Sequence, residues 1–412
     1  MENSNKIFEM ALGLPSPWFI KDLTINVDPD KSQGQIDIYI DFERGTRFKD
    51  KSGDGLKVHD TVVKTWQHLN FFQHICYLHA RIPRLVTNEG KVVTLEEVPW
   101  ARPGSKFTLL FEAFSMLLIE SEMPVSKAAD IMGVYPQRLW DVFGYWIKLA
   151  HANDPQKGVT KIGVDETSTK KGHNYVTVAV DMDSRRVIFA TPGKDAECIK
   201  ALKSHLEGKG VPNEQVKQAS IDMSPAYISG IMENFPKAEV TFDRFHVVKV
   251  INEAMDTVRK LESREFDMLK GHKYTFLKND GKLTREQKGE RYGLLMLYPT
   301  IANAFRLKEM FNELWAFKDI EEAGGFLAYW CDLVEESGIE PFRKAARTIL
   351  AHWSGIVNFA KSRLTNGILE GINSKIQLAK KRARGYRNID NFINMIYFIA
   401  GKLNFDYPQY FI

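Results

Sequence analysis

The chain has 412 residues, of which 26% are charged and 44% are hydrophobic, and its formal net charge is +4 at pH 7. This length predicts two or more domains, with the composition of an ordinary globular protein. The three cysteines, at positions 76, 198 and 331, are too widely spaced for a disulfide framework and favour a reduced cytosol. No uncharged apolar run reaches the roughly 18 residues of a membrane helix, so we expect a cytoplasmic protein without membrane contact.

Residues 1–104 are predicted to form a small α+β module. Apolar and polar residues alternate over 35–42 with the period of a half-buried strand. A cluster of four histidines and one cysteine follows: His59, His68, His74, Cys76 and His79. Structural zinc sites use paired close ligands, and only the last three of these residues are near one another. Ordinary packed or surface side chains are the favoured interpretation, and a metal site is the alternative.

Residues 105–155 have the layout of a helix-turn-helix. An apolar helical pattern over 107–119 precedes two further helices, the second of which runs toward Leu149. Small residues let the two helices cross closely, and Gly133 suits a left-handed turn between them. The hypothesis is a DNA-binding motif that places Arg138 near DNA, and a helical hairpin that only packs is the alternative.

From residue 156 to 260 the pattern changes to strands and helices. Five strands are predicted at 161–168, 173–182, 185–191, 216–222 and 238–242. Two helices are predicted between them, at 195–207 and 225–233. Three consecutive strands followed by alternating helices and strands are typical of a mixed five-stranded sheet with helices on its faces. This order matches the first part of a ribonuclease-H-like α/β catalytic core.

A large all-helical insertion is predicted over 261–360, with a charged loop at 279–290. Three tryptophans are expected to pack it: Trp315, Trp330 and Trp353. Residues 361–412 return to the α/β core with a helix near 367–385, and they contain nine Lys or Arg against three Asp or Glu. A solvated helix face would explain this excess. The alternative that we develop is contact with DNA phosphates through Lys375, Lys380, Lys381, Arg382 and Arg384.

Three acids are candidates for a metal site. Asp165 and Asp222 each come late in a predicted strand, and Glu370 shares a polar face of the last helix with Ser374, Gln377 and Lys381. Carboxylate oxygens suit Mg²⁺ or Mn²⁺, and two such ions roughly 3.5 to 4 Å apart assist phosphodiester cleavage. Taken singly, each acid is better explained as a surface or capping carboxylate.

Two neighbouring acids need separate treatment. Glu166 follows Asp165 directly, and adjacent residues of a strand point to opposite faces, so both are not expected to serve one site. Asp243 ends the fifth predicted strand and is a secondary candidate. His246 lies close to it in sequence and is a secondary candidate for acid-base work or a phosphate contact.

Five motifs occur in a fixed order, at 163–168, 171–175, 220–225, 241–246 and 369–374. Together they resemble the DDE transposases of bacterial insertion sequences, in the branch called the ISL3 family, and the likeness extends from about residue 36 to 402. The resemblance implies that Asp165, Asp222 and Glu370 are the DDE triad. It also implies that the helical insertion occupies the gap of 148 residues between the second Asp and the Glu.

One departure from the family concerns zinc. Members carry a Cys pair soon after the aromatic residue that matches Phe48, and a second metal-binding pair further along. This chain has Lys49 and Ser52 near the first place, and Val86 and Glu89 near the second. The resemblance therefore does not carry zinc over to this chain, and we expect none.

The hypothesis is a DNA transposase that binds double-stranded terminal inverted repeats through residues 1–104 and the helix-turn-helix. It would hydrolyse phosphodiester bonds with two metal ions and transfer the strand to target DNA, in the bacterial cytosol and associated with the nucleoid. Joining two ends implies a dimer or higher oligomer on DNA. The alternative is a transposase-derived DNA-binding protein without catalytic activity, indicated by the missing zinc ligands. A structure-specific nuclease is a third possibility, separable by whether strand transfer follows cleavage.

Overall fold

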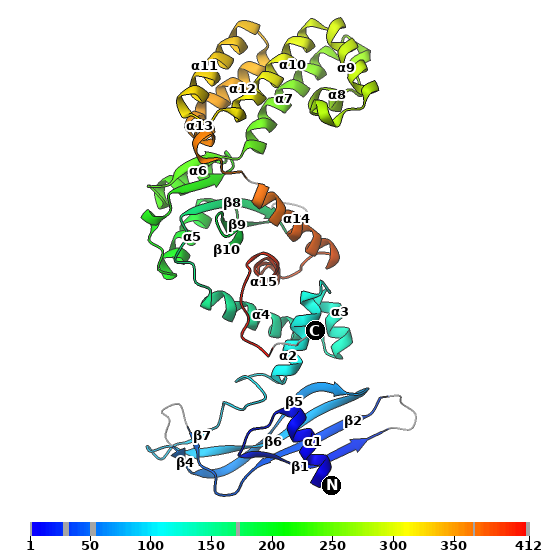
Figure 1. The fold of residues 1–412 in the computed structure, drawn as a ribbon, viewed down its shortest axis with the longest axis vertical. Coiled ribbons are helices and arrows are strands. Elements are labelled where there is room, and N and C mark those ends of the chain that lie inside the picture. Colours follow the sequence, from blue (N-terminus) through cyan, green and yellow to red (C-terminus); the bar gives the residue numbers. More distant parts are fainter. Residues whose placement is uncertain (1, 28–32, 50–54, 170–173, 366, 409–412) are drawn as a thin grey trace. The chain divides into compact units, whose positions relative to one another are not determined.

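The computed structural model describes residues 2–27, 33–49, 55–169, 174–365 and 367–408 (Figure 1). The chain divides into two units, of which the first contains residues 1–150 and 404–412 and the second contains residues 151–403. Among the residues described, no helix has both the length and the apolar character needed to span a bilayer.

The first unit begins with a sheet in the order β1-β2-β6-β5, with β7 paired to β6. Its elements are α1 (Glu2–Leu12), β1 (Trp18–Asn26), β2 (Gln35–Phe42), β5 (Val58–Phe71), β6 (His74–Val86) and β7 (Val92–Thr94), with a hairpin of β3 (Phe48–Lys49) and β4 (Gly55–Leu56). Strands β2 and β6 are parallel, and the other pairs are antiparallel. The predicted strand at 35–42 is confirmed. Strand β5 is not apparent from sequence because much of its first half is exposed on both faces.

The histidines and the cysteine between residues 59 and 79 lie on β5 and β6 or between them, and protein atoms satisfy them. His79 Nε2 lies 2.8 Å from Asp37 Oδ1, and His74 Nδ1 accepts a hydrogen bond from the Gly34 backbone. Burial raises the pKa of Cys76 to about 12, which disfavours the thiolate that a metal requires. In the described ranges, no three Cys, His, Asp or Glu side chains gather closely enough to bind one ion. The packed-side-chain interpretation therefore accounts for the cluster.

The positions compared with zinc ligands carry residues that are not thiols or imidazoles. Lys49 ends β3, Val86 ends β6, and the exposed Glu89 forms an ion pair with Lys91 at 2.9 Å. Ser52 lies outside the described residues. A thiol-bound metal has no ligands at the described positions, and the sheet is instead packed by its aromatic side chains.

Three helices complete the first unit: α2 (Leu109–Glu120), α3 (Val125–Met132) and α4 (Pro136–Asn153), whose last residues enter the second unit. Gly133 ends α3 with φ of +66°, which is the left-handed conformation that glycine adopts without strain. Ala128 and Ala129 are fully buried where the helices meet. The predicted helix-turn-helix geometry is therefore confirmed.

A buried carboxylate ties these helices to the segment before them. Glu112 is fully buried and accepts hydrogen bonds from Arg102 Nε at 2.8 Å and Trp146 Nε1 at 2.8 Å. Ser105 Oγ donates to its other oxygen at 2.6 Å. An unpaired buried charge would be strongly destabilising, so these donors fix the connector between the sheet and the helices.

The second unit contains a mixed sheet in the order β10-β9-β8-β11-β12. Its strands are β8 (Lys161–Ser168), β9 (Tyr175–Asp181), β10 (Arg186–Pro192), β11 (Gln218–Ile221) and β12 (Glu239–Phe242), with helices α5 (Ala196–Gly208) and α6 (Pro225–Asn234) between the later strands. The first three strands are antiparallel neighbours, whereas β8, β11 and β12 are parallel. The predicted mixed five-stranded sheet is confirmed.

Helices fill the sequence after β12, as predicted. They are α7 (Arg244–Glu262), α8 (Lys273–Leu277), α9 (Arg285–Leu297), α10 (Pro299–Asn312), α11 (Ile320–Ser337), α12 (Glu340–Ala351) and α13 (Trp353–Ser362), followed by α14 (Gly367–Arg382) and α15 (Ile389–Ala400). Short 3-10 turns lie at Asn213–Gln215, Asp267–Leu269, Asp280–Lys282 and Glu313–Ala316. The loop predicted at 279–290 is wrong in its second half, because Thr284 and Gln287 form a capping box that starts α9. Trp315 and Trp330 are buried in the hydrophobic core, and the half-buried Trp353 packs against it, as expected.

Helix α13 returns the chain from the insertion to the sheet. Asn358 Nδ2 donates to the carbonyl of Val240 in β12 at 2.9 Å, and Lys361 pairs with Glu239 at 2.8 Å. A Cβ on Gly355 would lie 2.4 Å from the Phe242 ring, so only glycine lets this helix lie so close to β12. The next helix, α14, lies beside β8 (Figure 1).

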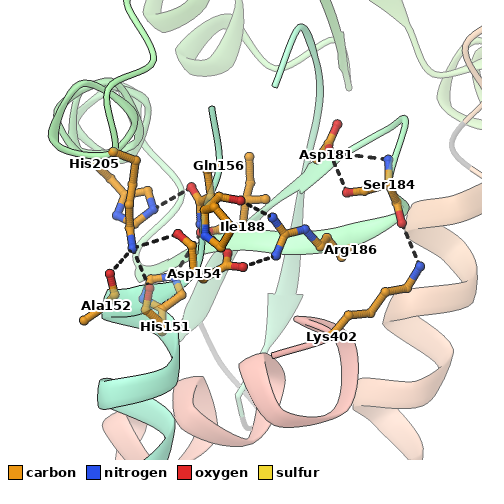
Figure 2. Close-up of polar contacts among 12 residues, drawn as sticks. His151, Ala152, Asp154, Gln156, Asp181, Ser184, Arg186, Ile188, His205 and Lys402 are labelled. Atoms are coloured by element: carbon orange, nitrogen blue, oxygen red, sulfur yellow. Dashed lines mark hydrogen bonds and ion pairs between the residues drawn. The ribbon is translucent and has the colours of Figure 1, made fainter. Parts of the chain in front are cut away.

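A polar network anchors the chain that enters the sheet, away from the carboxylates discussed below. Lys209 Nζ donates to the carbonyls of His151 at 2.6 Å and Ala152 at 2.7 Å, which satisfies the end of α4. His205 Nε2 lies 3.0 Å from Gln156 Oε1. Figure 2 shows these contacts together with the ion pair that joins Arg186 of β10 to Asp154 and with the contact from Lys402 to Ser184. The network fixes how the chain reaches β8.

Candidate active site

Three acids lie at one level across three adjacent parallel strands. The register of β8 and β11, continued two residues beyond the pair of Ser220 and Gly163, places Asp222 opposite Asp165. The register of β11 and β12, continued by one residue, places Asp243 opposite Asp222. Neighbouring strands are about 4.8 Å apart. Each of these three strands therefore carries an aspartate near its carboxyl end, and among the described residues no three acidic or histidine side chains converge closely enough to hold one ion.

Asp165 is held by two hydrogen bonds. Its Oδ1 accepts from the backbone N–H of Glu166 at 2.8 Å, and its Oδ2 accepts from Asn373 Nδ2 of α14 at 2.8 Å. Burial raises the pKa of Asp165 to about 6, which the hydrogen bond from Glu166 opposes and the nearby charges of Glu166 and Asp243 reinforce. A nearby cation would favour the ionised form of this carboxyl group.

Glu166 has a different environment from Asp165. Asp165 and Thr167 both hydrogen-bond to α14, so Glu166 between them points to the other face of β8, in agreement with strand alternation. Burial raises the pKa of Glu166, the charge of Asp222 adds to this, and Lys194 opposes it. Glu166 therefore contributes negative charge from the opposite face.

Asp243 and His246 form an ion pair at the start of α7. His246 Nδ1 lies 2.8 Å from Asp243 Oδ2, and Asp243 Oδ1 also caps α7 by accepting the backbone N–H of Phe245 at 3.1 Å. The hydrogen bond to Asp243 raises the pKa of His246, and the charges of Asp222 and Asp165 raise it further. When protonated, the His246 ring interacts electrostatically with all three aspartates.

Glu370 lies in the first turn of α14, exposed to solvent. The helix buries Leu369, Ile372 and Ile376, and Asn373, one turn after Glu370, reaches Asp165. Carboxylate oxygens are the donors that a hard divalent cation prefers, so the chemistry of the set fits Mg²⁺. Within the described part of the chain, no three such side chains lie close enough together to bind one ion.

The predicted polar face of α14, with Glu370, Ser374, Gln377 and Lys381, is exposed to solvent as expected. The contacts with β8 come from Asn373, Gln377 and Lys380, of which only Gln377 belongs to that face. The difference is one of helical phase, because two polar stripes flank the apolar one. Asn373 is the residue that sequence reasoning missed. Its position three residues after the glutamate and four before Gln377 is the pattern that could have identified it.

The basic residues predicted to contact DNA differ in their surroundings. Lys380 is half-buried and donates to the Ser168 carbonyl at 2.8 Å. The other members of the group on or after α14 are exposed: Lys375, Lys381, Arg382 and Arg384. Arg138 is exposed on α4, with its guanidinium 4.9 Å from the centre of the Phe107 ring. The charge available to a phosphate backbone is therefore mostly on the outer side of α14.

Comparisons with known proteins agree with this arrangement. A family model described as a transposase, of the DDE type in family ISL3, matches residues 162–396, and a model for the helix-turn-helix domain of transposase family ISL3 matches residues 96–147. The chain is 28% identical over 346 residues to the transposase for insertion sequence element IS1001 of Bordetella parapertussis, over 82% of this chain and 84% of that protein. It is 26% identical over 361 residues to the transposase for insertion sequence element IS1557 of Mycobacterium tuberculosis, over 79% of each. Because the first model spans more than half of the sequence, the chain belongs to the ISL3 family of insertion-sequence transposases.

Proposed function

We propose that Asp165, Asp222 and Glu370 are the catalytic carboxylates of this transposase, on a core of the ribonuclease-H-like type. The proposed reaction is hydrolysis of a phosphodiester bond at the end of the insertion sequence, which frees a 3′-hydroxyl group. That hydroxyl then attacks a phosphodiester bond of target DNA. The observation that supports the proposal is the parallel pairing of β8 and β11 up to Gly163 and Ser220, two residues before Asp165 and Asp222, together with the hydrogen bond from Asn373 of α14, one turn after Glu370, to Asp165.

The donor set fits two Mg²⁺ or Mn²⁺ ions held by these three carboxylates. Such ions, when bound, would neutralise negative charge on the attacking and leaving oxygens of the phosphate. The protein's part is orientation. Asp165 is fixed by Glu166 and Asn373, and Asp222 Oδ1 accepts the backbone N–H of Ser224 at 2.9 Å.

His246 has a supporting role in this proposal. Asp243 accepts the proton on Nδ1, so Nε2 is the ring nitrogen that can serve the substrate. An imidazolium beside three carboxylates offsets part of their mutual repulsion and can donate to a phosphate oxygen. When protonated, His246 supplies positive charge at the carboxyl ends of the strands, and Asp243 favours this protonated form.

The proposed partners are double-stranded terminal inverted repeats and target DNA, met in the bacterial cytosol. The helix-turn-helix supplies binding to double-stranded DNA. The exposed lysine and arginine side chains of α14 contact phosphates, and such contacts position DNA without reading its sequence. Two ends of one element must be held together for joining, so the active form on DNA is a dimer or larger. Residues 1–104 are proposed to assist repeat binding without zinc.

The test uses Asp165→Asn, Asp222→Asn and Glu370→Gln, with Glu233→Gln on the exposed side of α6 as the matched control. Cleavage and joining of labelled terminal-repeat DNA are measured in Mg²⁺, and DNA binding is measured by gel shift in chelator. Each site variant should lose more than about 100-fold in cleavage while binding stays near wild type, because charge at the phosphate is no longer neutralised. An Asp222→Asn protein that cuts or joins at the wild-type rate would refute the triad.

The same assay separates the alternatives. A wild-type chain that binds terminal repeats but never cuts them would be a DNA-binding derivative of a transposase. Cleavage without any strand transfer would indicate a nuclease. Both outcomes are read from the same gel.

A further inference from the structure

Three polar side chains of α14 make contact with β8 in sequence. Asn373 Nδ2 donates to Asp165 Oδ2 at 2.8 Å, and Gln377 Nε2 donates to Thr167 Oγ1 at 2.9 Å. Lys380 Nζ donates to the carbonyl of Ser168 at 2.8 Å. The order of the contacts shows that the helix and the strand run in the same direction.

The spacing of these contacts fits the two backbones. Seven residues of helix, from Asn373 to Lys380, rise about 10.5 Å. Three residues of strand, from Asp165 to Ser168, extend about 10 Å. Because the two lengths agree, the contacts form together in one register, and a slide of α14 by one turn would break them together.

The apolar side of α14 attaches the helix to the sheet, and the polar contacts add a directional restraint. Leu369, Ile372 and Ile376 are buried and attach the helix to the sheet. Apolar contact is non-directional, and exchange of one aliphatic neighbour for another costs little. The polar contacts are directional, with a narrow range of length and angle. They therefore fix the register of α14 together with the packing of Leu369 on Gly163.

Register matters because Glu370 is on the same helix. It precedes Asn373 by three residues, about 4.5 Å along the axis, and residues with that spacing are neighbours on a helix surface. The side chain of Glu370 is exposed, whereas that of Asn373 is anchored to Asp165. The distance between the two carboxylates is thus set one turn away from Glu370.

We infer that Asn373 is a positioning residue, which orients the carboxylate of Asp165 and fixes the register of α14 from which Glu370 reaches the site. This inference rests on the proposed catalytic roles of Asp165 and Glu370. Asn373 touches no reacting atom. Its amide group fixes the position of Glu370 relative to Asp165. Gln377 and Lys380 maintain the same register of α14 farther from the site.

The variants are Asn373→Ala, which removes the donor, and Asn373→Ser, which keeps a shorter donor and serves if the alanine protein folds poorly. Ser374→Ala, next to it on the exposed side of α14, is the matched control. Gln377→Ala tests a contact of the same kind farther from the acids. The measurements are the Mg²⁺ concentration for half-maximal cleavage, the cleavage rate at saturating Mg²⁺, and DNA binding by gel shift in chelator. Hydrogen exchange of peptides from α14 and β8 is followed in the metal-free protein.

Asn373→Ala should raise the half-maximal Mg²⁺ concentration by about 10- to 100-fold, as loss of an orienting partner of a metal ligand does. DNA affinity should stay within about twofold of wild type, because Asn373 faces β8 and not the outer basic surface. Amides of α14 should exchange faster without metal. The Mg²⁺ requirement of Asn373→Ser should lie between those of wild type and Asn373→Ala. Gln377→Ala should shift the requirement less than Asn373→Ala does, and Ser374→Ala should match wild type.

A wild-type Mg²⁺ requirement and wild-type exchange in Asn373→Ala would overturn the inference. So would equal shifts in Asn373→Ala, Gln377→Ala and Ser374→Ala, since that pattern indicates general destabilisation. Failure of the proposed function is recognised separately, because Asp165→Asn or Glu370→Gln would then still cleave DNA. The exchange measurement needs neither metal nor DNA, so it tests the register even in that case.

Discussion

Leu369 of α14 lies directly against the backbone of Gly163 in β8, two residues before Asp165. A Cβ on Gly163 would lie 2.9 Å from Leu369 Cδ1 and 2.6 Å from Met182 Sδ. Both distances are well inside van der Waals contact. The absence of a side chain at Gly163 is therefore what lets the helix that carries Glu370 approach the strand that carries Asp165.

Gly163→Ala should push α14 away from β8. Overpacking of this kind costs about 1 to 3 kcal/mol of unfolding free energy, and the shift of Glu370 should also lower the cleavage rate. Gly158→Ala is the control, because its Cβ would meet no atom within 4 Å. Urea unfolding and cleavage are measured on both variants. Equal stability and activity in the two proteins would contradict the close packing.

Cleavage should depend on pH through Asp165. Its pKa is about 6, so protons compete with metal as the pH falls through that value, and cleavage should fall with them. Glu166→Gln removes a charge that raises the pKa of Asp165, so the acid limb of the pH–rate profile should move to lower pH. Glu233→Gln should leave the limb in place. A limb that moves to higher pH in Glu166→Gln would count against the assignment.

The pair of His246 and Asp243 should stabilise the protein mainly in acid. The pKa of His246 is raised in the folded state, so its contribution is complete below the unfolded value of about 6.5 and is lost as pH rises through the folded value. His246→Gln should therefore reduce the free energy of unfolding more at about pH 6 than at about pH 9, by of the order of 1 kcal/mol. Urea unfolding at both pH values is the measurement, with His352→Gln, whose ring contacts the carbonyl of Thr348 instead of a carboxylate, as the control. No difference between the two pH values would exclude a stabilising ion pair.

Lysines on the two sides of α14 should behave differently toward DNA. The double variant Lys375→Ala and Lys381→Ala should reduce the slope of log affinity against log salt by about 0.9 for each phosphate that the variant no longer neutralises. Lys380→Ala should mainly lower stability, because its ammonium is bound to Ser168. Lys318→Ala, exposed in the insertion, controls for net charge. The interpretation fails if Lys380→Ala alone produces the larger change in slope.

Chelators should leave the N-terminal sheet folded. Trp100 packs edge-to-face on Trp18 at 5.0 Å and on Trp66 at 5.6 Å between ring centres, in a core built from several strands. Packing of this kind needs no metal, so EDTA should not change the melting temperature followed by tryptophan fluorescence. Metal analysis of the purified protein checks the same point. Stoichiometric zinc, with a melting temperature that drops in EDTA, would contradict this expectation.

The five-stranded sheet was predictable because its strands are short apolar runs, with two helical patterns between the later ones, an order typical of a mixed sheet. The phase of α14 was not predictable in the same way. Ser374 and Asn373 are both polar neighbours of the apolar stripe, and only the position of β8 decides which of them faces the site. Strand β5 was missed because exposure on both faces removes the alternation that identifies strands. The roles of the acids in catalysis stay a prediction from the motifs.

The contact between Asn373 and Asp165 joins residues that are 208 positions apart in the chain. At roughly 5 to 20 residues per second, a ribosome needs roughly 10 to 40 s to synthesise that stretch. The helix-turn-helix precedes this stretch, the sheet with Asp222 forms its first part, and Glu370 is among its last residues. On the proposed roles of the three acids, a chain that stops before α14 would keep the helix-turn-helix and lack the third carboxylate. The proposal therefore predicts that incomplete synthesis yields a chain that binds DNA and does not cut it.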